Sequence, residues 1–155
     1  MRKALWLSVT VAAASLLSGA CSSISGMGGI HLAAADLSAQ AKSQRPDPQK
    51  ALIYVYRNET MGHPTRMEVS LDDRIAGKTG AKTFFMFEVE PGRHEITSEA
   101  ENTDKLVVNA EAGKAYFVWQ EVKMGAWYAR NRLHLVDEPQ GRAGVAECRL
   151  LQTRF

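Results

Sequence analysis

From Lys50 onward, the sequence is divided into short runs of apolar residues that are separated by turn residues. Residues 51–57 (ALIYVYR) combine β-branched and aromatic side chains, which is typical of a strand buried on both faces. Residues 66–72 (RMEVSLD) alternate instead, so this strand would cover a core with one face and meet water with the other. Short runs at this spacing predict an all-β fold.

Further runs of the same kind predict the remaining strands. Residues 82–89 place Phe85, Phe87 and Val89 on one face, and the turn Glu90–Arg93 leads to an expected hairpin partner at 94–98. Three more strands are expected at 104–110, 115–122 and 133–136. About seven strands that each need a partner face predict an antiparallel β-sandwich domain over residues 50–155.

The tail over 139–151 leaves two readings open, a short helix or an edge strand. Gly141 and Gly144 weaken the helical reading, because glycine inside a helix is destabilising.

The first twenty residues have the pattern of a secretory signal peptide. Arg2 and Lys3 precede an apolar stretch over 4–17 that is too short for a permanent membrane-spanning helix. Residues 17–21 (LSGAC) resemble the bacterial lipobox, which predicts a lipoprotein signal peptide over 1–20, cleavage after Ala20 and lipidation of Cys21. The alternative is ordinary signal-peptidase cleavage after Ala20, which would leave a free thiol.

Lipidation of Cys21 would anchor the chain to a membrane, because several acyl chains together make attachment stable. Ser22 is not acidic, which is similar to the lipoproteins of the outer membrane, so we expect the domain to face the periplasm from that membrane. Residues 21–49 are rich in Ser, Gly, Ala and Gln and predict a flexible, disordered tether. A short helix over 32–42 is the alternative.

Cys148 is the second of the two cysteines. Its apolar neighbours predict a buried, inert thiol, although an unlipidated Cys21 would allow a Cys21–Cys148 disulfide.

The charge of the chain is balanced outside the leader. Nineteen Lys and Arg face seventeen Asp and Glu, and Arg2 and Lys3 account for the difference. The polycationic surface of a nucleic-acid-binding protein is therefore not expected.

Motifs for common enzymatic chemistry are absent from the sequence. It contains no GxSxG, P-loop or HExxH pattern, and the four histidines, at positions 31, 63, 94 and 134, are isolated from one another. His94 is expected to stabilise a turn, and His134 to point away from the core. No metal site, cofactor or catalytic residue is predicted.

Residues 123–132 (KMGAWYARNR) stand out as a connection that carries two large aromatic and two arginine side chains. Such side chains dominate contact surfaces, so Trp127, Tyr128, Arg130 and Arg132 are the candidate partner-binding residues. The alternative is that the two rings cap the end of the core. The loop Met61–Pro64 would adjoin this surface or lie at the opposite end.

Several segments, in chain order, resemble domain of unknown function 2846, a bacterial family of envelope lipoproteins. The segments are ALIYVYR (51–57), SLDDRIAGKTG (70–80), FFMFEVEPGRHEI (84–96), EAGKAYFV (111–118) and RLHLVDEPQG (132–141). The turn Pro91–His94 is also similar to surface modules of the PEGA type, whose sandwiches are prealbumin-like. The resemblance implies a β-sandwich, an envelope location and a lipid anchor, and it supplies no catalytic residue.

Three hypotheses about function follow. The first is a non-enzymatic, membrane-anchored lipoprotein whose sandwich binds an envelope protein or a glycan. The second is an assembly accessory of an envelope complex that acts through an exposed sheet edge. The third is a small hydrolase.

Overall fold

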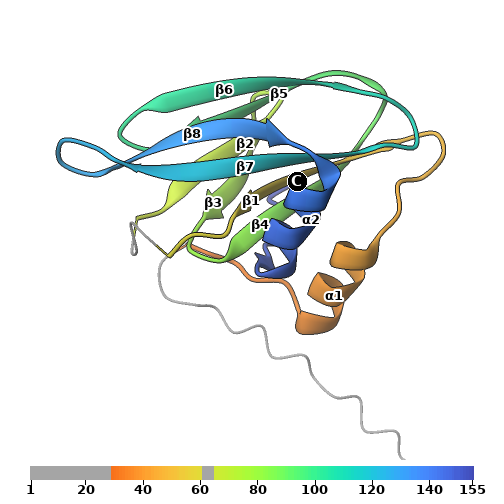
Figure 1. The fold of residues 1–155 in the computed structure, drawn as a ribbon, viewed down its shortest axis with the longest axis horizontal. Coiled ribbons are helices and arrows are strands. Elements are labelled where there is room, and N and C mark those ends of the chain that lie inside the picture. Colours follow the sequence, from red (N-terminus) through yellow and green to blue (C-terminus); the bar gives the residue numbers. More distant parts are fainter. Residues whose placement is uncertain (1–28, 61–64) are drawn as a thin grey trace, which may run out of the picture.

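A computed structural model describes residues 29–60 and 65–155, and within them it contains nine strands in two sheets and two helices (Figure 1). The elements are α1 (Ala35–Ser43), β1 (Ala51–Arg57), β2 (Met67–Leu71), β3 (Arg74–Thr79), β4 (Thr83–Val89), β5 (Gly92–Glu99), β6 (Thr103–Ala110), β7 (Ala115–Met124), β8 (Ala129–Val136), α2 (Glu138–Ala146) and β9 (Arg149–Leu150). One sheet has the order β8-β7-β1-β4-β9 and the other β3-β2-β5-β6. The predicted β-sandwich architecture is confirmed.

The pairing of the strands differs from the prediction in two respects. The turn after β4 does not form a hairpin, because β4 pairs with β1 and β9 whereas β5 pairs with β2 and β6. The chain crosses from one sheet to the other at Pro91. The sheets are also not purely antiparallel, since β1 pairs with β7, and β4 with β9, in parallel.

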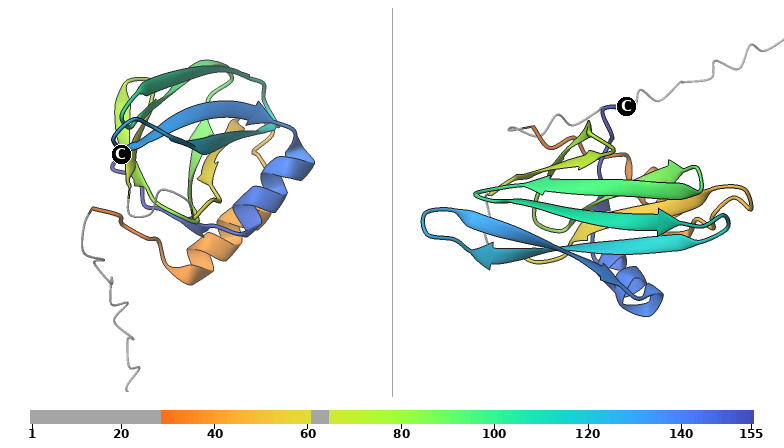
Figure 2. Two further views of the ribbon diagram at one scale, coloured as in Figure 1. Left: turned by 60° about the vertical axis from the view of Figure 1, so that its left-hand side comes forward. Right: turned by 90° about the horizontal axis from the view of Figure 1, so that it is seen from above.

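Strand β1 is buried on both faces, as predicted, because a layer packs against each of them. Towards the second sheet, Ile53 and Val55 contact a core to which Val69, Ile96 and Val108 belong. On the opposite face, β1 lies beneath the two helices (Figure 2).

The helix-covered face holds a second apolar cluster, which is built around aromatic rings. Tyr54 stacks on Phe117 with ring centroids 4.9 Å apart, and Tyr56, Val145 and Cys148 complete the centre of the cluster. Burial of each large side chain contributes roughly 1.5–3 kcal/mol. Cys148 is buried as predicted.

For the tail over 139–151, a short helix and an edge strand were the two alternatives. The structure contains a helix over residues 138–146, which the short strand β9 follows. Asp137 caps the helix by accepting the N–H of Gln140 at 2.9 Å. A Cβ atom on Gly141 would lie 2.2 Å from Phe117, and one on Gly144 would lie 2.1 Å from Tyr56. The glycines that weaken the helix in isolation therefore let it pack closely on the sheet.

The tether prediction is wrong for the described part of residues 21–49, because α1 is docked against the domain. The N–H of Ala33 donates to Leu150 O at 2.9 Å, and the Tyr54 hydroxyl donates to Ala41 O at 2.9 Å. Backbone hydrogen bonds and small buried residues hold this segment, so no pattern of large apolar residues marks it. The predicted leader, Ala20, Cys21 and the tether up to residue 28 lie outside the described residues.

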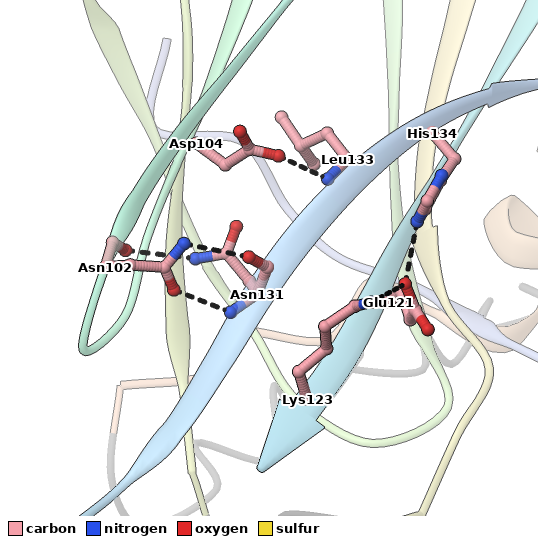
Figure 3. A network of polar contacts seen from close by, with 7 residues as sticks. All are labelled: Asn102, Asp104, Glu121, Lys123, Asn131, Leu133 and His134. Atoms are coloured by element: carbon pink, nitrogen blue, oxygen red, sulfur yellow. Dashed lines mark hydrogen bonds and ion pairs between the residues drawn. The ribbon is translucent and has the colours of Figure 1, made fainter. Parts of the chain in front are cut away.

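The two open sides of the sandwich are bridged. On one side the C-terminal residues join the sheets, with Leu151 N donating to Phe84 O at 2.8 Å and Arg154 N to Ala76 O at 3.0 Å. On the other side, side chains of residues 102–104 reach across to β8 (Figure 3).

Candidate contact surface on the β7–β8 hairpin

Strands β7 and β8 form a hairpin that projects past the end of the sandwich (Figure 1). Met124 pairs with Ala129, so the connection consists only of residues 125–128. The predicted loop over 123–132 is therefore wrong in extent, and Arg130 and Arg132 lie on β8. Asn131 occupies a buried, inward-facing position of β8. Because it is polar, the sequence does not show the alternation of apolar and polar residues that would indicate a strand here.

The apex of the hairpin, which we define as Met124–Tyr128, presents three large side chains to solvent. Met124 is 82% exposed, Trp127 88% and Tyr128 74%. The alternative that the two rings cap the core is therefore wrong. Because these side chains bury almost nothing within the domain, their apolar surface remains available for contact with another molecule.

Glu101, in the turn between β5 and β6, holds the backbone of the apex. Its carboxylate accepts the N–H groups of Ala126 at 3.3 Å, Trp127 at 3.3 Å and Tyr128 at 2.8 Å. The hydrogen bond from Tyr128 is the largest influence on the carboxyl group and, with the other two, lowers the pKa of Glu101 below its ordinary value. The exposed rings thus stand on a backbone with a defined conformation.

Sequence reasoning did not identify Glu101 as a functional residue. Its partners lie 25 to 27 residues away along the chain, and they become neighbours only when the two sheets pack. No local pattern around Glu101 indicates this role.

A pair of asparagines anchors the middle of the hairpin (Figure 3). The N–H of Asn131 donates to Asn102 Oδ1 at 2.8 Å, and Asn102 Nδ2 donates to Asn131 O at 2.9 Å. Further along β8, the N–H of Leu133 donates to Asp104 Oδ2 at 2.7 Å. Together with Glu101, these contacts secure β8 against the second sheet.

The outer face of the hairpin is polar and mainly cationic. Arg130 lies opposite Lys123, and Arg132 opposite Glu121, on the face that points away from the core. Glu121 contacts His134 at 2.7 Å and Lys123 at 3.3 Å. Among the described residues, the side chains of Arg130 and Arg132 make no hydrogen bond and no ion pair, although the charge of Arg130 helps to lower the pKa of Glu101. His134 lies on this outer face, as predicted.

A groove of about 370 Å³ lies on the inner side of the hairpin, where the apex meets the second sheet. Tyr128 and Glu101 form part of its wall, and the remaining lining residues are Thr65, Arg66, Glu68, Lys78, Glu99, Ala100 and Ala129. The loop Met61–Pro64, which was expected near one end of the domain, lies outside the described residues.

His94 stabilises turns, as predicted. Its Nδ1 contacts Asp72 Oδ2 at 2.6 Å and its Nε2 contacts Glu90 O at 2.8 Å. Both partners only accept hydrogen bonds, so the doubly protonated ring satisfies both. Burial alone would lower the pKa of His94, but the bonds to Asp72 and Glu90 outweigh it and raise the pKa above its ordinary value. We assign His94 a structural role.

Cys148 also has a structural environment. Its Sγ–H is placed to donate to Gly144 O at 3.2 Å, and burial raises the pKa of the thiol to about 12. Within residues 29–60 and 65–155, no three His, Cys, Asp or Glu side chains gather closely enough to hold a metal ion. Neither described helix has the length and apolar character that crossing a membrane requires.

The described residues thus define a mainly β, two-sheet domain with an aromatic hairpin held clear of its core. Residues 47–131 match the family described as "Protein of unknown function (DUF2846)", and the chain belongs to this family. The match includes the apex and Glu101. The chain is also similar to an uncharacterized protein of Haemophilus influenzae, with 28% identity over 148 residues that cover 94% of this chain and 84% of the relative.

Proposed function

We propose that this protein is a non-enzymatic lipoprotein of the bacterial cell envelope, anchored by lipid on Cys21. The outer membrane, with the domain facing the periplasm, is the proposed location. The sandwich acts as a binding module for an envelope protein or a glycan. The candidate contact residues are Trp127, Tyr128, Arg130 and Arg132.

One observation carries this proposal, namely the exposure of Trp127 and Tyr128 on a backbone that Glu101 holds in place. An apex with a defined backbone lowers the entropic cost of binding, because less of the loop has to be ordered when a partner binds. Aromatic and arginine side chains are also the residue types that contribute most to binding energy.

The groove beside Tyr128 supports the proposal of a partner that contacts more than the apex. It places one aromatic wall next to charged side chains of both signs, including Glu68 and Lys78. Either a peptide or a sugar chain offers the apolar and polar groups that such a surface contacts.

The alternative, an accessory that pairs through a sheet edge, receives less support from the structure. Leu151 and Arg154 bridge one open side in the described part of the chain, and Asn102 and Asp104 bridge the other. An added strand would have to displace these contacts.

The contact surface is tested by placing a photo-crosslinking amino acid at position 128 in the full-length protein in cells. The same probe at Asn109, an exposed residue of β6, is the control. We expect a defined adduct from position 128 that is lost when Trp127→Ala and Arg130→Ala are added. An adduct that survives both changes, or one that forms only from position 109, would overturn this surface.

The anchor is tested separately by the intact mass of the protein recovered from membranes. We expect a chain that begins at Cys21 and carries lipid, and a Cys21→Ala variant that is released in soluble form. An unmodified chain that stays with the membranes would refute the anchor without affecting the crosslinking result.

A further inference from the structure

We infer that the apex and the outer face of the β7–β8 hairpin bind an anionic lipid surface, as a second membrane contact beside the lipid on Cys21. The inference rests on the proposed envelope location, since it requires a bilayer within reach. It goes beyond the proposed function, because it gives Trp127, Arg130 and Arg132, which are also candidate contacts of the envelope partner, a second role at the membrane surface.

The shape of the apex favours a surface over a small ligand. Met124 and Trp127 project from the outermost turn of the hairpin and are almost fully exposed. Small ligands bind in concave sites, whereas this site is convex. Trp and Tyr side chains are enriched at the interface between lipid and water, because their rings are apolar and their N–H or O–H groups remain hydrated.

Three backbone N–H groups of the apex already have a hydrogen-bond acceptor within the protein, which favours entry into a medium with little water. Free N–H groups are costly to bury in lipid, since the hydrocarbon offers no hydrogen-bond acceptor. The N–H groups of Ala126, Trp127 and Tyr128 already donate to Glu101. The rings can therefore enter the interface without exposing unsatisfied donors from these three residues.

The charges next to the apex complement an anionic surface. Lys123, Arg130 and Arg132 lie together on the outer face, where Glu121 is an opposing carboxylate, and a second carboxylate, Glu101 behind the apex, attracts Arg130. Both arginines project from β8 without an ion pair among the described residues, so they are available for lipid phosphate groups. Each cation near such a surface strengthens binding roughly five-fold.

The position of the proposed anchor keeps the domain, and with it the hairpin, within reach of the bilayer. Even fully extended, the chain from Cys21 to Ile30 spans at most roughly 30 Å. A lipidated Cys21 therefore keeps the domain near the membrane surface at a high effective concentration. A weak contact through the hairpin is then sufficient to orient the domain.

Tryptophan fluorescence tests this inference, because the chain after the leader contains only Trp119 and Trp127. The sample is the mature chain that begins at residue 21 and carries Cys21→Ala, so that no lipid anchor contributes. Trp119→Phe leaves Trp127 as the reporter, and Trp127→Phe leaves Trp119 as the matched control. Each is titrated with vesicles of phosphatidylethanolamine and phosphatidylglycerol.

We expect the Trp127 emission to shift to the blue and to be quenched by brominated lipid, while the Trp119 emission changes little. Replacing Lys123, Arg130 and Arg132 by Gln should lower vesicle affinity roughly 100-fold, from three cations at about five-fold each. The control replaces Arg93, Lys105 and Lys114 by Gln, which removes the same charge from exposed positions outside the hairpin.

A Trp127 emission that does not respond to anionic vesicles would overturn the inference, as would equal losses in the two triple variants. Because the sample lacks lipid on Cys21, a negative result would leave the anchor and the groove untouched. Conversely, an unlipidated Cys21 in cells would refute the proposed anchor without changing the vesicle titration.

Discussion

The outer face of the five-stranded sheet has two halves, one covered by helices and one exposed to solvent. One half lies beneath α1 and α2, where Phe117 of β7 packs against Tyr54 and the backbone of α2. The other half belongs to the far ends of β7 and β8, whose apex carries Trp127 and Tyr128 in solvent. The same hairpin therefore contributes aromatic residues to both halves.

This difference separates the residues that stabilise the fold from the residues that are available for contact with a partner. In the covered half, rings are buried and helix glycines allow close approach, so each ring contributes to folding. In the bare half, Glu101 and the Asn102–Asn131 pair secure the backbone, and the large side chains above it contribute little to the fold. An apolar side chain that the fold does not use is a candidate for binding.

The largest expected effect lies in the covered half, with Phe117→Ala. Removing this buried ring should lower the free energy of unfolding by about 3–5 kcal/mol, because it leaves a cavity beneath α2. Urea unfolding followed by circular dichroism measures the loss. Tyr128→Ala at the apex is the control, and a loss of similar size there would remove the distinction between the halves.

A second change in the covered half adds a single methyl group, with Gly144→Ala. Alanine normally stabilises a helix relative to glycine, but here its Cβ would lie 2.1 Å from the Tyr56 ring. The clash should lower the free energy of unfolding by about 1–3 kcal/mol. Thermal unfolding shows whether Gly144→Ala stabilises or destabilises the protein. An increase in Tm would show that α2 does not pack as closely as described.

Acid should affect the bare half through Glu101. Its pKa is lower in the folded protein than the value of 4.5 for an unperturbed carboxyl, so its support for the apex is complete above that value. The support is lost as the pH falls through the folded-state pKa. The protection factors of the Ala126, Trp127 and Tyr128 amides, which correct the measured hydrogen-exchange rates for the intrinsic effect of pH, should fall over this range.

The variant Glu101→Gln should accelerate exchange of the same amides at neutral pH and leave urea unfolding almost unchanged. Glu99→Gln removes a neighbouring carboxylate and is the matched control. Equal protection of the apex amides in the two variants would mean that Glu101 does not hold the apex.

The smallest expected effect on stability belongs to Trp127→Ala. Its side chain is almost fully exposed, so the free energy of unfolding should change by less than about 0.5 kcal/mol. The crosslink from position 128 should nevertheless weaken. A large loss of stability would show that the indole ring serves the fold and would make the two halves alike.

Much of the secondary structure is predictable because it depends on neighbouring residues. The uninterrupted apolar run of β1 and the alternation in β2 indicate how many faces of each strand are buried. Strand β3 was missed, since its residues Arg74–Thr79 include a glycine and only a short apolar run. Docking of α1 was also missed, because its buried residues Ser38 and Ala41 are small.

The sequence by itself determined the β-rich domain, the burial of Cys148 and the segment that carries Trp127 and Tyr128. Only the tertiary structure decided that β4 and β5 belong to different sheets, that Glu101 supports the apex and that the rings face solvent. Side-chain alternation along a strand follows from local backbone geometry, so it is visible in a short stretch of residues. Sheet membership and exposure instead depend on contacts between residues far apart in the chain, for which local patterns contain no signal.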